Sequence, residues 1–257
     1  MPFFEISKTG RERRTEGYLI PKEQTMLTHP FCQRLNQCLE HHLKFLKPGL
    51  REQTYARNAI VYQPHYQPGD LYYLMEGRVK IGFVSRDGNE VIVRIVEPGE
   101  FFGDIPISYG LKDSTIARTM SRSRIRHIPY LELNIVMRDD HELMRTFIAM
   151  VGEHTLQAYE HIRMLVLDRV AQRIARWLFI QVHDSPEEWV SIPNMLTHQA
   201  LAGFIGSSRE VVTSCLNTFK KDGLIEYNRA SFRVHRPSLE RFLLQSGLDL
   251  EELSLHL

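Results

Sequence analysis

The sequence has little cysteine, no long apolar run and almost no excess of charge, and each absence excludes a class of protein. Its three cysteines, Cys32, Cys38 and Cys215, are too few and too scattered for a disulfide framework or a four-thiolate metal site. No run of about 18 apolar residues could span a membrane, and the first residues lack the charged-then-apolar order of a secretory signal. We therefore expect a cytoplasmic protein with no membrane partner.

Charge is almost balanced, because 32 Lys and Arg residues against 31 Asp and Glu residues give a net charge of +1. No field from the whole molecule would hold nucleic acid, so any contact with DNA must come from a local patch. Hydrophobic residues make up 43% of the 257 residues, as in an ordinary folded protein. A chain of this length is expected to form two domains, each with its own core.

Hydrophobic periodicity divides the chain into segments. Residues 1–26 show little periodicity and are expected to form an N-terminal arm. In residues 27–46 apolar side chains recur every three or four positions, which is typical of amphipathic helices. In residues 55–128 the period becomes two and Gly-containing turns interrupt it. This pattern predicts a β-barrel effector or sensor domain over residues 27–138, whose interior can hold one small ligand.

The clearest hairpin of this β-rich part is RVKIGFVSRDGNEVIVRIV, residues 78–96, with an Asp-Gly turn in its middle. Apolar residues alternate with others along both of its strands: Val79, Ile81, Phe83, Val91, Val93 and Ile95. This alternation predicts that these side chains share one face of the sheet.

Beyond Asp139 the pattern becomes helical for about forty residues. Apolar and histidine side chains fall on one stripe at spacings of three and four residues: Leu143, Phe147, Met150, His154, Ala158, His161 and Leu165. A stripe of this length can pair with a second copy of itself, so we expect a dimerisation helix over residues 139–167. The alternative is that the stripe packs against the β-domain of its own chain. Asp168 interrupts the pattern, and VAQRIARWLFIQV predicts a second helix.

The last part, residues 168–257, contains a pattern of two short helices. Thr197 can cap the first helix, and Gly206 can form the turn after it. Ser207 can cap the second helix, with Glu210 three residues on completing a capping box. Two short helices joined by such a turn predict a helix-turn-helix, whose second helix enters the DNA major groove with its N-terminal residues on base edges.

Arg209 and Glu210 stand at the head of this second helix. A cation in the first turn is disfavoured by the helix dipole by about 0.3–1 kcal/mol, which indicates that another interaction keeps Arg209 there. A guanidinium can bond guanine O6 and N7, and a carboxylate can accept from cytosine N4, so the two residues could read a G·C step. Capping and base reading compete for the single Glu210 carboxylate.

The segment EYNRASFRVHR, residues 226–236, predicts two short strands that form the wing of a winged helix-turn-helix. Between residues 197 and 241 seven Lys and Arg residues stand against four Asp and Glu residues. This local excess suits salt-dependent phosphate contacts. The predicted DNA contacts are Thr197, Ser207, Ser208, Arg209, Glu210, Thr213, Ser214, Lys221 and Arg229.

The order of small β-barrel, long helix and C-terminal winged helix-turn-helix resembles the cyclic-AMP receptor protein/fumarate-nitrate regulator (CRP/FNR) family of bacterial transcription regulators. The likeness is carried by EGRVKIGFVSRDGNE, EPGEFFGD, LMRTF, LDRVAQRIARWL and GSSREVV. The resemblance implies an α+β fold with a cyclic-nucleotide-binding-like β jelly roll. It also implies a homodimer on a double-stranded, pseudo-palindromic operator, with RNA polymerase as a candidate partner.

In the cAMP-responsive members, a Gly-Glu pair and a later Arg-Ser pair hold the cyclic phosphate, and Thr and Ser on the long helix hold the adenine. Here the arginine position falls on Asp113, whose carboxylate repels a phosphate, unless Arg118 reaches inward instead. The adenine positions fall on Gln157 and Ala158. We therefore expect an effector other than cAMP, unidentified, or none. The expected pocket comprises Gly103, Asp104, Ile105, Ser114, Thr115 and Gln157.

Other functions remain as alternatives. A cyclic-nucleotide-responsive regulator and a haem-based gas or redox sensor would use the same scaffold, and twelve histidines leave room for the latter. The iron–sulfur branch of the family needs four cysteines, which this sequence lacks. A module with a degenerate helix-turn-helix would act through protein contacts. An enzyme on the barrel would need a metal-binding histidine cluster, for which His65 and His127 are too isolated. We expect neither catalysis nor a metal site.

Overall fold

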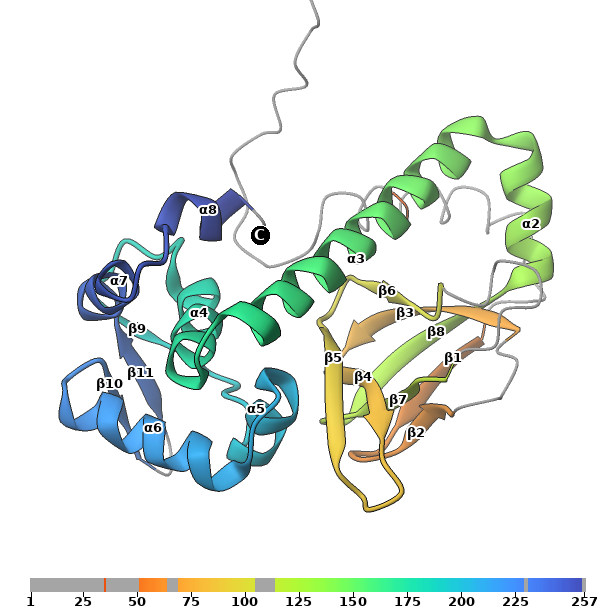
Figure 1. The fold of residues 1–257 in the computed structure, drawn as a ribbon. Helices are drawn as coiled ribbons and strands as arrows, with labels where there is room; N and C mark the ends of the chain where they lie inside the picture. The colour runs from red at the N-terminus through yellow and green to blue at the C-terminus, as the bar shows by residue number, and fades with distance from the viewer. Residues whose placement is uncertain (1–34, 36–50, 64–68, 105–113, 229–230, 256–257) are drawn as a thin grey trace, which may run out of the picture.

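The structure is a computed structural model that describes residues 35, 51–63, 69–104, 114–228 and 231–255. The expected N-terminal arm and all but one residue of the expected helices over residues 27–46 lie outside these described residues. Leu35 is helical and fully buried. A β-rich N-terminal part and a mostly helical C-terminal part are joined by one long helix, α3 (His141–Leu167) (Figure 1).

The N-terminal part is a jelly roll of two four-stranded antiparallel sheets, which confirms the predicted fold class. The first sheet has the order β1-β8-β3-β6, with bounds Arg51–Tyr55, Ser123–Pro129, Asp70–Glu76 and Phe101–Phe102. The second has the order β2-β7-β4-β5, with bounds Ile60–Tyr62, Ile116–Thr119, Val79–Val84 and Glu90–Val96. Apolar side chains of both sheets meet between them, among them Tyr72, Leu74, Val79, Phe102 and Ile125.

The alternation predicted for the β4–β5 hairpin holds at Val79 and Ile81, which are buried, but fails farther along. Phe83 and Val91 are each 43% exposed, whereas Ile92 is fully buried. The reason is a register shift between Ile81 and Gly82, which has the effect of a β-bulge and reverses which side chains face inward. Ile92 therefore packs into the hydrophobic core of the C-terminal domain.

Helix α2 (Tyr130–Asp139) follows the last strand of the barrel and leads directly into α3. The Asp140 carboxylate accepts hydrogen bonds from the backbone N–H groups of Glu142 and Leu143, at 2.8 and 2.9 Å, and so caps α3. The helix thus begins at His141, two residues after the predicted start, and ends at Leu167 as predicted. Although α3 has 27 residues, neither it nor any other helix of the described part is long and apolar enough to cross a membrane.

The first part of the α3 stripe, which was predicted to form the dimer interface, packs against its own chain instead. Leu143, Phe147 and Met150 are buried in one cluster with barrel residues such as Leu71 and Phe101. No second copy can contact side chains that are already covered in the monomer. For these three residues the dimer-interface prediction is wrong, and the alternative of packing against the β-domain is correct.

Farther along the stripe, three partly buried side chains also contact their own chain. His154 bonds to a carboxylate of the barrel, described below. His161 packs edge-on against Phe204, with ring centroids 4.6 Å apart. Leu165 lies against the turn at Gly206, where an added Cβ would be 2.9 Å from the Leu165 Cδ2. The stripe therefore joins α3 to both domains of its own chain.

A different face of α3 is uncovered. Its large side chains are 55–73% exposed: Ile148, Leu156, Tyr159, Ile162 and Val166. At about 100° per residue, this face is centred roughly a third of a turn around the helix from the predicted stripe. Ala158, which is exposed, lies at the border between them. We call these five residues the α3 apolar face, because a contiguous exposed patch of this kind marks an interaction site.

The C-terminal domain is a winged helix-turn-helix, as predicted. Its helices are α4 (Val170–Val182), α5 (His198–Ile205), α6 (Arg209–Lys221), α7 (Arg236–Gln245) and α8 (Leu250–Leu255). Its sheet has the order β10-β11-β9, with bounds Ile225–Tyr227, Phe232–His235 and Trp189–Ser191. Helix α4 has the bounds of the predicted VAQRIARWLFIQV helix, and β10 and β11 are the two predicted wing strands.

Asp168 stands at the junction between α3 and α4. Its Oδ2 lies 3.0 Å from Arg176 Nε, and the two side chains are only 8% and 9% exposed. Arg173 donates to the backbone carbonyls of Leu165, Asp168 and Ile205, at 2.6, 2.9 and 2.9 Å. One guanidinium therefore ties the end of α3 and the junction to the end of α5.

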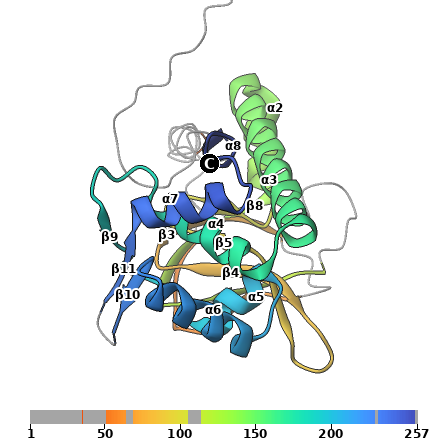
Figure 2. The same ribbon diagram turned by 60° about the vertical axis from the view of Figure 1, so that its left-hand side comes forward.

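The β4–β5 hairpin of the barrel contacts the C-terminal domain, with β5 lying beside α5 (Figures 1 and 2). At Gly203 of α5 an added Cβ would lie 3.0 Å from the Glu90 carbonyl oxygen, so only a glycine fits easily here. Arg78 donates to the Asn194 carbonyl at 2.6 Å. The position of the helix-turn-helix is thus set by the barrel as well as by α3.

Candidate DNA-binding surface and effector pocket

The first helix of the helix-turn-helix is built as the sequence predicts. Thr197 is the N-cap of α5, and its Oγ1 accepts from the Ala200 backbone N–H at 3.2 Å. Leu201 and Ile205 are fully buried. Gly206 ends α5 with a φ of 62°, a left-handed conformation that favours glycine. This turn sets the angle at which α6 leaves α5.

The second helix begins one residue later than predicted. Ser208, not Ser207, is the N-cap of α6, and its Oγ accepts from the Val211 backbone N–H at 3.3 Å. Ser207 still belongs to the turn, because its own N–H bonds to the Ala202 carbonyl at 2.9 Å. The predicted capping box of Ser207 and Glu210 is therefore wrong. Val211, in the first turn of α6, is 43% exposed.

Glu210 is fully exposed at the start of α6, and its carboxylate bonds locally. Hydrogen bonds from its own backbone N–H and from the Ser208 hydroxyl lower its pKa below the ordinary value, with a further contribution from the charge of Arg209. The carboxylate is thus ionised at neutral pH and acts only as an acceptor. An acceptor at this position complements a cytosine N4 amino group.

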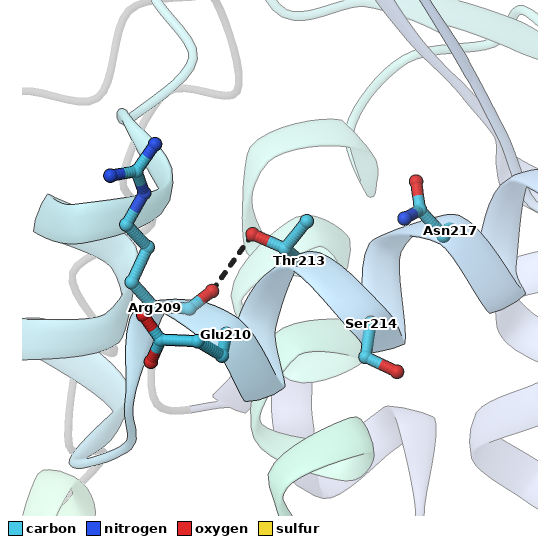
Figure 3. A pocket seen from close by; sticks show the side chains of 5 residues that line it. All are labelled: Arg209, Glu210, Thr213, Ser214 and Asn217. Atoms are coloured by element: carbon cyan, nitrogen blue, oxygen red, sulfur yellow. Dashed lines mark hydrogen bonds between the residues drawn. The ribbon is translucent and has the colours of Figure 1, made fainter.

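Five side chains of α6 line a shallow open hollow on its surface: Arg209, Glu210, Thr213, Ser214 and Asn217 (Figure 3). Arg209 is exposed, and within the described part of the chain its guanidinium makes no hydrogen bond or ion pair. Four of the five are among the predicted DNA contacts, so the structure brings these four to one surface. Asn217 was not predicted. Its position seven residues after Glu210 was the signal in the sequence that it shares this surface.

The structure describes four of the five remaining predicted contacts. Lys221 is exposed at the C-terminal end of α6, where its charge faces solvent. Thr197 and Ser208 each use the side chain as a helix cap. Arg229 lies outside the described residues. No described residue of the wing was predicted as a contact, but Arg233 of β11 is partly exposed and lies over the Trp189 ring, 5.3 Å from its centroid.

The expected effector pocket centres on the end of β6. Gly103 has a φ of +80°, and an added Cβ would lie 2.7 Å from the Tyr72 ring, so glycine is required here. The Tyr130 hydroxyl donates to the Gly103 carbonyl. Burial, together with the charge of Asp104, raises the pKa of Tyr130, so the hydroxyl keeps its proton. The backbone that carries Asp104 is thereby fixed.

Asp104 forms a buried pair with His154 of α3, whose Nδ1 lies 3.0 Å from Asp104 Oδ2. The side chains are 12% and 9% exposed. Burial raises the pKa of the Asp104 carboxyl, but the hydrogen bond and charge of His154, with the charge of Arg94, lower it by more, so the pKa lies below its ordinary value. The pair links the barrel directly to α3.

Replacing Asp104 by Asn is expected to destabilise the protein at neutral pH, because a hydrogen bond to a charged group contributes about 1.5–3 kcal/mol. The folded pKa lies below the unfolded value of about 3.9. The stabilisation is therefore complete above about pH 4 and is lost as the pH falls through the folded pKa. Thermal unfolding midpoints of both proteins, measured from neutral to acidic pH, should converge below about pH 4. A difference that does not change with pH would contradict this.

The other expected pocket residues are only partly connected to this pair. Thr115 is buried, with its hydroxyl 3.3 Å from the Tyr62 hydroxyl, and Tyr62 stacks on Tyr72 beside Gly103. Gln157 lies three residues after His154 on α3 and is partly buried. Ser114 is exposed. Ile105 and Asp113 lie outside the described residues.

Among the described residues, neither an inward-reaching Arg118 nor a metal-binding histidine cluster is found in the barrel. Arg118 does not reach inward, because it donates to the Asn58 carbonyl at the exposed surface. His127 bonds to Tyr55 and Asp70, each at 3.0 Å. Within the described part of the chain, no group of three or more His, Cys, Asp and Glu side chains is arranged to hold a metal ion.

Two protein families match the chain. Residues 52–140 match the cyclic nucleotide-binding domain, and residues 172–242 match the Crp-like helix-turn-helix domain. The chain is 28% identical over 174 residues to the transcriptional regulator SdrP of Thermus thermophilus, covering 66% of this chain and 82% of that one. It is 24% identical over 190 residues to the global nitrogen regulator of a Nostoc species, covering 72% and 85%.

Solved structures share the fold. FixK2 from Bradyrhizobium japonicum superimposes with a TM-score of 0.66 at 18% identity, covering 75% of this chain and 96% of that one. A CRP/FNR family regulator from Thermus thermophilus gives a TM-score of 0.63 at 23% identity, covering 77% and 100%. With a cyclic nucleotide-binding domain followed by a Crp-like helix-turn-helix, the chain belongs to the CRP/FNR family of transcription regulators.

Proposed function

We propose that this regulator binds a pseudo-palindromic operator as a homodimer and that an effector in the barrel sets its activity. The observation that carries the proposal is the head of α6, where the guanidinium of Arg209 and the ionised carboxylate of Glu210 are both exposed. Among the residues that the structure describes, the guanidinium has no partner. A donor beside an acceptor at the start of a recognition helix complements a G·C step in the major groove. The protein would act on DNA in the cytoplasm without catalysis, with RNA polymerase as a candidate partner.

The α3 apolar face supports the dimer. In a two-fold dimer the same patch of each copy meets its counterpart, so one apolar stripe is sufficient to form the interface. Pairing through α3 would present two copies of α6 to half-sites about 34–36 Å apart, one turn of DNA. The homodimer is therefore the species we propose to bind the operator.

The effector is proposed to act near the Asp104–His154 pair, with Gly103, Thr115 and Gln157 as neighbouring contacts. An effector shifts activity only when it binds the DNA-competent dimer more tightly than the incompetent one. In the sequence, the arginine position of the cAMP-responsive members is occupied by Asp113. A carboxylate there would repel a cyclic nucleotide phosphate. We therefore propose an effector other than cAMP, or activity without one.

Replacing Arg209 by Ala is expected to cost about 1–3 kcal/mol of specific binding and to relax the preference for G·C at one position of each half-site. Lys221→Ala is the matched control, because a phosphate contact should weaken binding to all sequences alike. Fluorescence anisotropy with specific and random duplexes measures both effects. Equal losses on specific and random duplexes for Arg209→Ala would exclude base reading by this residue.

The proposed function is tested with a labelled duplex that carries a TGTGA-type inverted repeat, against a scrambled duplex, with and without cAMP. Selective binding that does not require cAMP supports the proposal. Selective binding only with cAMP would retain the DNA-binding function and overturn the proposed exclusion of cAMP. Salt-independent binding, or no binding to either duplex, would favour a module that acts through protein contacts instead.

A further inference from the structure

Asn217 is held in one orientation by a residue from the wing. It is exposed on α6, in the hollow that also contains Arg209 and Glu210 (Figure 3). The Tyr227 hydroxyl donates to Asn217 Oδ1 at 2.8 Å. The carboxamide oxygen therefore already has a protein donor. This hydrogen bond restricts rotation of the carboxamide about the Cβ–Cγ bond.

Tyr227 is itself well fixed on β10. Its ring stacks on Phe232, with centroids 5.6 Å apart and an interplanar angle of 16°. Lys220 Nζ lies 4.7 Å from the centre of the same ring and donates to the Tyr227 carbonyl at 3.1 Å. Contacts on the ring and on the backbone hold the phenol independently of Asn217. The Tyr227–Asn217 bond is thus a rigid link from the wing to α6.

The Asn217 amide nitrogen, in contrast, makes no hydrogen bond to any residue that the structure describes. At about 100° per residue, Asn217 lies about 20° from Glu210 and about 40° from Thr213 around the helix axis. It therefore faces the same side as two predicted base contacts. At 1.5 Å per residue it is about 10 Å from Glu210 along α6, roughly the length of three base-pair steps.

We propose that Asn217 is a base-reading residue of the recognition helix and that Tyr227 is its positioning residue. This inference rests on the proposed DNA-binding function. Asparagine ordinarily pairs with adenine, because its Oδ1 accepts from the N6 amino group and its Nδ2 donates to N7. With Oδ1 bonded to Tyr227, the side chain presents chiefly its amide hydrogens to the groove. Guanine, which offers the acceptors N7 and O6, is then the preferred base, at a pair about three steps from the one that Glu210 reads.

The test uses the duplex that the wild-type protein enriches from a random pool, together with every single-base variant of its half-site. Dissociation constants are measured for wild type, Asn217→Ala and Tyr227→Phe. Wild type should prefer guanine to adenine by about ten-fold at one base pair. Asn217→Ala should reduce this preference to about two-fold or less at that pair alone. Tyr227→Phe keeps the ring and frees Oδ1, so adenine should become the preferred base there.

Thr218→Ala is the matched control, because Thr218 is the next residue of α6, is exposed and points about 100° away around the helix. Its base profile should equal that of wild type. An unchanged profile for Asn217→Ala, a uniform loss on all duplexes, or a wild-type preference retained in Tyr227→Phe would each overturn the proposal. Failure of the wild-type protein to enrich any sequence would instead contradict the proposed DNA-binding function.

Discussion

Replacing Ile162 by Asp is expected to convert the protein into a monomer. Ile162 lies within the α3 apolar face, and a two-fold interface would bury two copies of the new carboxylate close together. An uncompensated buried charge costs about 3–5 kcal/mol, which weakens dimerisation at least about 100-fold. Because one half-site alone binds weakly, selective binding to an inverted repeat should be lost as well.

The oligomeric state is measured by sedimentation equilibrium, over a range of protein concentrations. Leu244→Asp is the matched control, since Leu244 on α7 is 56% exposed and Ile162 is 55% exposed. It introduces the same charge at an equally exposed apolar position outside α3, and should leave the dimer intact. A dimer that survives Ile162→Asp with unchanged affinity would show that the subunits associate through another surface.

Replacing Asp168 by Ala is expected to lower the free energy of unfolding by about 3–5 kcal/mol, because it leaves the buried Arg176 guanidinium without its partner. Both tryptophans of the chain, Trp177 and Trp189, lie in the C-terminal domain. Urea unfolding followed by tryptophan fluorescence therefore reports on this domain. Asp168 also joins α3 to α4, so the variant should bind the operator more weakly even at temperatures where it stays folded.

Asp184→Ala provides the control for this prediction. Asp184 lies 3.1 Å from His183 but is 79% exposed, and exposed ion pairs contribute about 0–1 kcal/mol. The double variant Asp168→Ala/Arg176→Leu should recover most of the lost stability, because it removes the uncompensated charge. A loss of less than about 1 kcal/mol for Asp168→Ala would contradict the importance of this pair at the junction.

Helix limits and turns were predictable where local chemistry determines them. Thr197 caps α5 and Gly206 adopts a left-handed conformation, and both features depend on neighbouring residues alone. The limits of α4 also follow from its own periodicity. The N-cap of α6 was misplaced by one residue because Ser207 and Ser208 have the same capping chemistry, and only the path of the turn decides between them.

The α3 apolar face was not predictable in the same way. Helix α3 carries apolar side chains on two faces, and periodicity detects both without saying which one the barrel covers. Met150 and Ile162 illustrate this, because they have similar local sequence signals, yet one is fully buried and the other is exposed. The choice depends on tertiary packing against Leu71 and Phe101, far away in the sequence.

The recognition surface shows the same difference between features set by local sequence and features set by tertiary packing. Arg209 and Glu210 were predictable from their place at the head of a helix. The spacing from Glu210 places Asn217 on the same surface, but the orientation of its side chain was not predictable, because it depends on Tyr227, ten residues away on another element. The buried Ile92 depends on the register shift in the β4–β5 hairpin, which no periodicity reveals. Features that depend on contacts between different helices and strands were therefore the ones that could not be predicted from the sequence.

The most direct test of the proposed function is repeated selection from a pool of random duplexes by the wild-type protein, followed by sequencing of the enriched DNA. The proposed homodimer predicts an inverted repeat with a G·C pair in each half-site and centres about 10–10.5 base pairs apart, or a multiple of this. Recovery of a single asymmetric site would contradict the two-fold dimer. No enrichment at all would contradict sequence-specific DNA binding.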